Sequence, residues 1–369
     1  MKKVIVLGAG LTGCVTTKEL VKKGYDVTLI ERNAYLGGGC HTFFMGGHPY
    51  TEGPRMLTII NEKIFDYINK EVPLRRFKFY ADTYIEQDRA FYSYPIYWDD
   101  IMRMPDKDKI QDELNRLPKE NNATNFEDAW LNAVGPTLYG KYVKTYTEKM
   151  WQVNSNRVFE GYTWSLKGSP IQHKDRAAAD RGITEYAYPF DENGFNPFFD
   201  KCVQNAEVRL NTEIQHVDLE KKKVYINDNE VLSADIIIST LPLDDLMENT
   251  YGSLRYMGRE FYPVVLPVEH IFKDGHQFIY YPNDEKYTRI VEYKTLTMHK
   301  SQDTLICIEV PSTVNKLYTY AHVPEERAKA ELYKKAIPSD VYSIGQMGSY
   351  EYSGIDYCIE QVWELMREF

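Results

Sequence analysis

The N-terminal end of the chain alternates apolar runs with turn and helix patterns. An apolar run, Val4–Leu7, leads into the glycine-rich hexapeptide GAGLTG at 8–13, and apolar residues at helical spacing follow over 15–23. A second apolar run, Val27–Ile30, ends at Glu31. A strand, a glycine turn, a helix, a second strand and a terminal acid in this order predict a βαβ unit that binds a dinucleotide.

The glycines and the acid of this unit each have a predicted task. Gly8 allows the tight turn, Gly10 lets the backbone approach the pyrophosphate, and Gly13 lets the helix pack closely on the strand. The helix N-terminus faces the diphosphate, and Glu31 is placed to accept hydrogen bonds from both ribose hydroxyls. The candidate cofactor contacts in this unit are Gly8, Gly10, Thr12, Gly13, Glu31 and Arg32.

Two later segments favour FAD over NAD as the dinucleotide. The glycine run Gly37–Gly39 resembles the extended fingerprint of glutathione-reductase-type flavoproteins of the amine oxidase class, in which extra glycines keep a second loop close to the cofactor. The apolar run ADIIISTLP at 234–242 is similar to the buried strand that re-enters the cofactor domain in that class. Further candidate contacts with FAD are Gly38, Gly39, Val217 and Gly345.

The fold class predicted from these patterns is α/β. Residues 1–80, 205–250 and 335–369 are assigned to a Rossmann-like FAD-binding domain of the glutathione-reductase type. Within it, alternating residues over 208–231 predict a hairpin, and the apolar spacing over 355–369 predicts a last helix that packs back on this domain.

The middle of the chain predicts two further parts and a loop. Residues 98–165 show helical spacing and form a helical insertion. The β-rich runs in 80–97 and 256–322 predict an antiparallel sheet that covers the substrate. Residues 166–190 lack sustained apolar periodicity and are predicted to form a mobile surface loop.

Composition narrows the function classes. With 369 residues, a formal net charge of −10 and a pI near 5.4, the chain is not expected to bind nucleic acid or anionic membranes, so a phosphate-bearing ligand needs a local cluster of arginine or lysine. Five scattered cysteines without a CxxC pair fit a reduced cytoplasm. No apolar run is long enough for a transmembrane helix, and no His/Cys cluster has metal spacing. The 30 tyrosines suit either a wet cleft for sugars and bases or a tyrosine-rich core.

Three local segments resemble one family. They are YTEKMW at 146–151, YTRIVEYK at 287–294 and SYEY at 349–352, and they stand in the same order as similar segments of the bacterial UDP-galactopyranose mutases. Together with the N-terminal unit they span nearly the whole chain. The resemblance implies a non-redox isomerase that needs reduced FAD.

The family's chemistry sets the expected partners. The resemblance implies that flavin N5 attacks the anomeric carbon of a nucleotide-diphosphate sugar and forms a flavin–sugar adduct, from which the pyranose recloses as a furanose for surface polysaccharide such as a capsule. The substrate is expected to be a UDP-sugar, with GDP and dTDP as other carriers, and a reductant must supply electrons to FAD. A homodimer is left open, and neither nucleic acid nor membrane is expected as a partner.

The family's site residues transfer to matching positions. Tyr146 would stack on the nucleobase, Thr147 would lie beside the nucleotide, and Trp151 would pack at the sugar. Arg289 matches the fixed arginine that holds the diphosphate, for which a bidentate guanidinium is suited. The family's second arginine lies on a mobile loop, where the sequence here contains His173, Lys174 and the favoured Arg176. The diphosphate-contacting tyrosines would be Tyr318 or Tyr320, and Tyr352.

Departures from the family put the sugar in doubt. The chain reads Gly53-Pro54-Arg55 where the family has Gly-Ala-His, so Arg55 becomes a candidate catalytic residue beside Arg289 and Arg176. Gly354 replaces an acid and is expected to open volume near the ribityl chain or the sugar, and Gln346 replaces an arginine near the cofactor. We therefore expect a sugar other than galactose. A flavin oxidase or desaturase of the amine oxidase type is the alternative reading, and a non-catalytic nucleotide-sugar-binding relative is a third.

Overall fold

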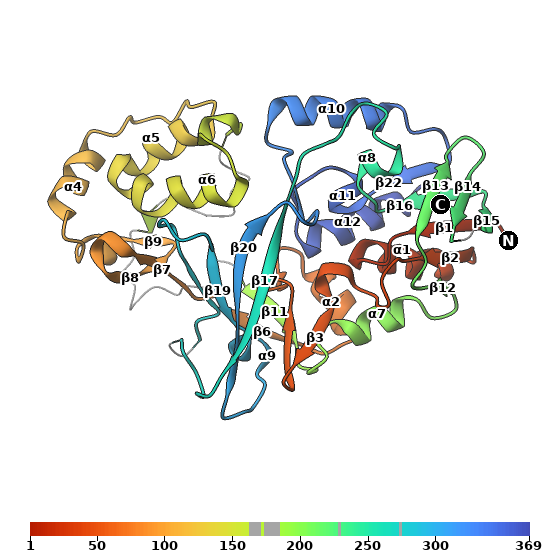
Figure 1. Ribbon diagram of the computed structural model, residues 1–369, viewed down its shortest axis with the longest axis horizontal. Coiled ribbons are helices and arrows are strands. Elements are labelled where there is room, and N and C mark those ends of the chain that lie inside the picture. Colours follow the sequence, from red (N-terminus) through yellow and green to blue (C-terminus); the bar gives the residue numbers. More distant parts are fainter. Residues whose placement is uncertain (162–170, 173–184, 228–229, 273–274) are drawn as a thin grey trace.

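The computed structural model describes residues 1–161, 171–172, 185–227, 230–272 and 275–369. A parallel sheet with its helices lies at the end of the molecule that holds both termini, and a group of helices lies at the opposite end (Figure 1). Long strands in the centre of the molecule lie between these two groups. No helix in the described ranges is long and apolar enough to cross a membrane.

The parallel sheet has five strands in the order β12-β2-β1-β16-β22. Successive side chains of β1 point to opposite faces of this sheet, and both faces are buried. Val4 and Val6 belong to the core shared with helices α1, α7 and α12, whereas Ile5 and Leu7 belong to the core shared with the antiparallel meander β13-β14-β15. The bounds are β1 Lys3–Leu7, α1 Leu11–Lys22, β2 Asp26–Ile30, α7 Asn196–Cys202, β12 Glu207–Arg209, β13 Ile214–Asp218, β14 Lys223–Ile226, β15 Glu230–Ser233, β16 Ile236–Ser239, β22 Val341–Ser343 and α12 Ile355–Leu365.

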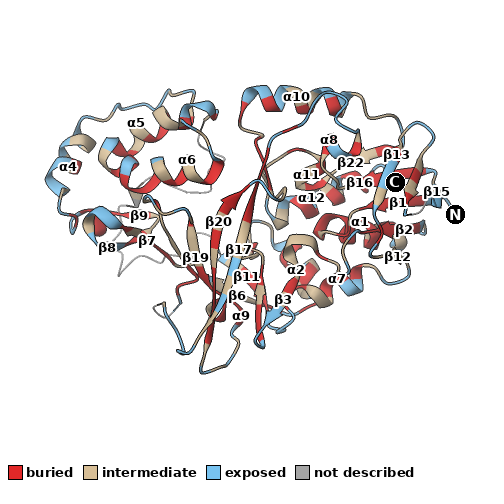
Figure 2. Ribbon diagram, viewed as in Figure 1, coloured by how far each residue is buried: buried red, intermediate tan, exposed pale blue. Residues whose placement is uncertain are grey.

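A seven-stranded sheet occupies the centre, in the order β21-β17-β20-β19-β18-β7-β8. Its longest strands, β17 and β20, pair antiparallel along their length, and β20 is largely buried (Figure 2). The predicted antiparallel sheet is therefore present, except that β18 and β7 run parallel. The bounds are β7 Ala81–Ile85, β8 Ala90–Tyr94, β17 Tyr256–Leu266, β18 Phe278–Tyr280, β19 Arg289–Glu292, β20 Thr304–Ser312 and β21 Tyr318–Thr319.

The helical segment packs against one end of this sheet through a single apolar core, which includes Trp130, Leu138 and Met257. Its longest helix begins where Asn125 caps it by accepting a hydrogen bond from the Asp128 amide at 2.9 Å. Gly135, at φ 78°, precedes Pro136 and kinks this helix. The bounds are α3 Trp98–Ile101, α4 Lys107–Asn115, α5 Phe126–Tyr139, a π-helical turn Gly140–Lys144 and α6 Thr145–Trp151.

Smaller elements complete the described structure. The hairpin β3-β4 follows the glycine run, and β5, β11 and β6 form a three-stranded sheet. The remaining bounds are β3 Thr42–Met45, β4 His48–Thr51, β5 Leu57–Thr58, α2 Glu62–Asn69, β6 Leu74–Lys78, β9 Ile96–Tyr97, β10 Ile171–Gln172, β11 Glu185–Pro189, α8 Leu243–Leu246, α9 Lys294–Thr297, α10 Pro324–Lys335 and α11 Gly345–Gly348, with short 3-10 turns at Gly38–Cys40, Glu86–Asp88 and Asn156–Val158.

The predicted loop over 166–190 is wrong at its C-terminal end. Residues 185–189 form strand β11, which pairs antiparallel with both β5 and β6. The partners of this strand lie more than a hundred positions earlier in the chain, so its own short pattern does not reveal the pairing. Residues 162–170 and 173–184, which include Arg176, lie outside the described residues.

Candidate functional site: a dinucleotide cavity beside an arginine cluster

The glycine turn between β1 and α1 is built as the sequence predicts. A Cβ placed on Gly13 would lie 1.9 Å from the Gly8 carbonyl oxygen, so only glycine lets α1 approach β1 this closely. A Cβ on Gly10 would meet no protein atom within 4 Å, which leaves open space in front of the helix N-terminus. Backbone amides and open space together suit a phosphate group at this point.

Glu31 is held at the end of β2 by backbone donors. Its Oε2 accepts a hydrogen bond from the Ala9 amide at 2.8 Å, and its Oε1 accepts from the amide and side chain of Asn33 at 2.9 and 2.8 Å. An ionised carboxylate offers about four acceptor positions. The fixed orientation therefore leaves acceptor capacity toward the neighbouring cavity for ribose hydroxyls.

A cavity of about 740 Å³ runs from this turn between the parallel sheet, the meander and the strand-connecting loops. It is large enough for an extended cofactor. Of the predicted cofactor contacts it is lined by Gly8, Gly10, Glu31, Arg32, Gly38, Gly39 and Val217. Thr12, Gly13 and Gly345 do not line it. Gly345 packs instead against Thr12, since a Cβ there would lie 2.8 Å from the threonine Oγ1.

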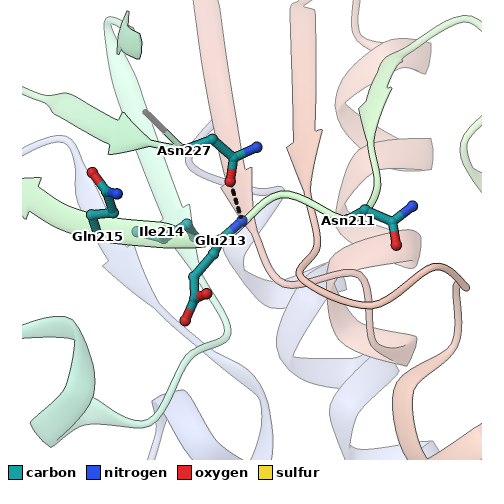
Figure 3. Close-up of a pocket in the computed structure, with 5 residues that line it drawn as sticks. All are labelled: Asn211, Glu213, Ile214, Gln215 and Asn227. Atoms are coloured by element: carbon teal, nitrogen blue, oxygen red, sulfur yellow. Dashed lines mark hydrogen bonds between the residues drawn. The ribbon is translucent and has the colours of Figure 1, made fainter. Parts of the chain in front are cut away.

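A smaller cavity of about 690 Å³ adjoins the first one (Figure 3). It shares Glu213, Ile214 and Gln215 with the larger cavity and adds Asn211 and Asn227. The Asn227 side chain accepts a hydrogen bond from the Glu213 amide at 3.0 Å and so ties the start of β13 to the end of β14. The meander thus forms a polar wall beyond Glu31, which the sequence pattern did not indicate.

Two arginines share one carboxylate on the seven-stranded sheet. Arg289 of β19 lies directly opposite Glu309 of β20, and its Nε donates to Glu309 Oε2 at 2.6 Å. Arg259 of β17 approaches the same Oε2 with Nη1 at 2.9 Å. The side chains of Arg259 and Glu309 are 3% and 0% exposed, and that of Arg289 is 14% exposed.

Arg55 joins the cofactor cavity to these arginines. Its Nε donates to the carbonyl oxygens of Gly39 and Glu52, both at 3.0 Å. A Cβ on Gly39 would lie 3.2 Å from the Arg55 guanidinium, and one on Gly53 would lie 3.4 Å from that of Arg289. Arg55 therefore folds onto the second glycine loop, between the predicted flavin site and the sheet.

Tyr318 lies within reach of all three guanidinium groups. Its burial raises the pKa of the phenol, but the positive charges of Arg259, Arg55 and Arg289 outweigh this effect and leave the pKa below its ordinary value. The Tyr318 ring also packs against Tyr352, with centroids 5.8 Å apart. The two tyrosines predicted to contact a diphosphate are thus neighbours beside a concentration of positive charge.

Two aromatic residues of helix α6, Tyr146 and Trp151, pack against tyrosines near this cluster. The Tyr146 ring packs edge-on against Tyr280, which pairs with Arg289 across β18 and β19. Trp151 is 4% exposed and packs against Tyr320, whose hydroxyl donates to the Trp151 carbonyl oxygen. Tyr320 is thereby committed to the helix, which leaves Tyr318 as the tyrosine at the arginines. Thr147, also on α6, is buried.

The structure shows what surrounds Gly354 and Gln346, two positions at which the sequence departs from the family. A Cβ on Gly354 would lie 2.6 Å from Asp356 Oδ1, so the carboxylate of Asp356 fills the space that the glycine was expected to open. Burial raises the pKa of this carboxyl group. Gln346 donates to the Leu317 carbonyl oxygen at 2.7 Å. The expectation of added volume at Gly354 is therefore wrong, because two residues further on a side chain folds back.

Sequence reasoning missed Arg259 and Glu309. Both lie on strands that the β-rich runs predicted, but neither belongs to one of the family-like segments. The available signal was a charged residue within an expected strand, since Arg259 directly follows Met257 and Gly258, which are both buried. Among the described residues no group of His, Cys, Asp or Glu could hold a metal ion.

The chain is similar in sequence to known proteins along its whole length. Residues 141–352, more than half of the chain, match the family described as UDP-galactopyranose mutase, and residues 6–70 match an NAD(P)-binding Rossmann-like domain. The chain is 23% identical to a probable UDP-galactopyranose mutase of Klebsiella pneumoniae, over 100% of this chain and 94% of that protein. It is 21% identical to the dTDP-fucopyranose mutase of Escherichia coli, over 99% and 97%.

A solved structure shows the same fold. A crystal structure of reduced UDP-galactopyranose mutase superposes with a TM-score of 0.85 at 17% identity, and the match covers 100% of this chain and 95% of that one. The parallel sheet, the helical segment and the central sheet are thus one shared architecture.

Proposed function

Because the chain belongs to the UDP-galactopyranose mutase family, and is therefore a flavin-dependent pyranose–furanose mutase, we propose that its substrate is a pyranose carried on a nucleoside diphosphate. UDP is the favoured carrier, with dTDP and GDP as alternatives, since an E. coli relative is named for a dTDP-sugar. The enzyme is an isomerase, and its cofactor is FAD. When bound and reduced, FAD would supply a nucleophilic nitrogen for reaction at the anomeric carbon of the sugar.

The observation that carries this proposal is the arginine cluster beside the cofactor cavity. The guanidinium groups of Arg259 and Arg289 contact one carboxylate, of Glu309, and all three guanidinium groups, including that of Arg55, act on Tyr318. This leaves two positive charges in a largely buried site of a chain whose net charge is −10. A diphosphate supplies the matching negative charge, and in a low-dielectric site such pairing is strong.

The surrounding side chains have corresponding tasks in the proposal. Arg289 and Tyr318 hold the diphosphate, while the Tyr146 ring takes the nucleobase beside Tyr280. The leaving nucleotide keeps its charge compensated throughout, so it can return to the rearranged sugar. Arg176, outside the described residues, is proposed to be the second arginine that acts on the diphosphate.

The direct test is turnover by the reduced holoenzyme. We expect nucleotide-linked furanose to appear by NMR only after reduction with dithionite or a nicotinamide, with no net consumption of reductant. Stoichiometric oxygen uptake together with an oxidised product would replace this proposal by the oxidase reading. Binding of a nucleotide sugar without any conversion, in the reduced and in the oxidised protein, would favour the binding-only reading.

The identity of the sugar is proposed from Arg55. A permanent cation with five donors stands between the second glycine loop and the diphosphate cluster, where the family carries a histidine that can be neutral. We propose that another nucleotide-linked pyranose is converted at least about tenfold more efficiently than UDP-galactose, a difference of about 1.4 kcal/mol. A panel of UDP-, dTDP- and GDP-sugars decides this, and UDP-galactose as the best substrate would show that Arg55 is a tolerated variation.

The cellular setting follows from the substrate. Nucleotide sugars and a flavin reductant are expected in the cytoplasm, and all five cysteines of the chain are free, as suits a reducing compartment. We therefore place the enzyme there, supplying a furanose for surface polysaccharide. Fractionation that located the protein outside the reducing compartment would contradict this placement.

A further inference from the structure

Arg259, Glu309 and Arg289 form a buried triad across three adjacent strands. Arg259 on β17 and Arg289 on β19 both contact Oε2 of Glu309, on the intervening β20. All three side chains lie on one face, since Phe261, two residues after Arg259, stands opposite Glu309 and Glu309 stands opposite Arg289. The strand order thus places one negative charge between two positive ones.

Stability alone gives no reason for such a triad. Replacing a buried Arg–Glu–Arg group by apolar side chains of similar volume is often neutral or stabilising, because desolvation offsets the attraction. Two of its polar atoms, Arg259 Nε and Glu309 Oε1, are buried and have no hydrogen-bond partner among the described residues. The cost of burying these groups points to a task in the site.

The charge count shows what Arg259 changes. With Glu309 and Arg289 alone, the carboxylate would neutralise the guanidinium, and an incoming anion would meet a pair without net charge. With Arg259 on the same oxygen, the triad keeps one positive charge. Arg289 is the most exposed of the three side chains, so this charge is presented there.

Arg259 is also fixed from two further sides. Its Nη1 donates to Thr288 Oγ1 at 2.6 Å, and its Nη2 lies 2.7 Å from Met150 Sδ. Thr288 directly precedes Arg289, and Met150 lies on α6 together with Tyr146. One guanidinium therefore holds the helix of the predicted nucleobase contact against the strand of the predicted diphosphate contact.

We propose that Arg259 is a positioning residue that shares the Glu309 carboxylate with Arg289, so that the triad keeps a net positive charge, presented at Arg289, toward the diphosphate of the substrate. The inference rests on the proposed nucleotide-diphosphate substrate. It assigns a specific task to a residue outside the family-like segments.

The test measures binding of UDP and of inorganic pyrophosphate to the oxidised holoenzyme, by calorimetry, in the wild type and in three variants. Arg259→Met should weaken both probes at least tenfold, because Glu309 then neutralises Arg289. Glu309→Gln should bind both at least as tightly as the wild type. The double variant Arg259→Met/Glu309→Gln should recover to within threefold of the wild type, since the charge of Arg289 is then no longer offset and the group again has one net positive charge. A purely structural role for Arg259 predicts no such recovery.

The controls separate this inference from the proposed function. Arg76→Met removes an exposed arginine that also pairs with two carboxylates, Glu62 and Glu185, and should leave both affinities unchanged. FAD content and the unfolding temperature identify any variant that fails to fold, and Arg259→Lys gives a second, milder variant with an intermediate loss. A double variant as weak as Arg259→Met, or an Arg259→Met that binds like the wild type, overturns the inference. A wild type that binds pyrophosphate but no nucleotide overturns the nucleotide assignment. The affinities of the variants for pyrophosphate then test the role of Arg259 by themselves.

Discussion

Gly10→Val should remove FAD from the protein while leaving the fold intact. Gly10 has φ −67° and ψ −177°, an extended conformation that valine adopts readily, and a Cβ there meets no protein atom within 4 Å. The apoprotein should thus be as stable as the wild type, or up to about 1 kcal/mol more stable, because valine restricts the unfolded chain. The branched side chain would instead occupy the space predicted for the pyrophosphate. We expect FAD affinity to fall at least about 100-fold, which corresponds to about 2.7 kcal/mol.

Gly13→Ala is the matched control, because it should lower the stability of the fold itself and not only the affinity for FAD. Its Cβ would lie 1.9 Å from the Gly8 carbonyl oxygen and 3.0 Å from the Gly8 carbonyl carbon, so α1 must move away from β1. Overpacking of this kind costs about 1–3 kcal/mol and should lower the unfolding temperature even without cofactor. The ratio of flavin to protein absorbance reports FAD content, and thermal unfolding of the apoproteins reports stability. Full FAD retention by Gly10→Val, or a destabilised Gly10→Val apoprotein, would refute the placement of the phosphate turn.

The remaining predictions concern turnover and titration. Arg289→Ala should cost about 2–4 kcal/mol in kcat/KM, since a charge-assisted contact to the leaving nucleotide is lost; steady-state kinetics near the wild type would remove Arg289 from the diphosphate site. Arg176→Ala should raise KM as well as lower kcat, because it acts through closure of its segment, and an unchanged KM would argue against that role. Reconstitution with 5-deaza-FAD should abolish turnover, since the carbon at that position has no lone pair, and retained product formation by NMR would exclude attack by N5. Tyr318 should ionise at lower pH than an ordinary tyrosine, because its folded-state pKa is depressed by the arginines, and Arg259→Met should shift its pKa upward; an alkaline absorbance titration unaffected by Tyr318→Phe would contradict this.

The sequence by itself determined the elements whose cause is local. The turn between β1 and α1 needs glycines because backbone groups approach within a few residues, and the start of α5 at Asn125 needs only a cap three residues from its donor. The hairpin of β13 and β14 is likewise encoded by alternation and a short connection. The family-like segments added Tyr146 and Arg289, because their residue types recur in a recognisable order.

Only the tertiary structure decided which charges face each other. Arg259, Arg289 and Glu309 meet because β20 inserts between β17 and β19, and Arg55 reaches them from the loop between β4 and β5, more than two hundred positions earlier. Cross-strand register depends on long-range packing, which leaves no periodic trace in the chain. For the same reason the sequence pattern did not predict strand β11, because its hydrogen-bond partners β5 and β6 lie far away in the chain.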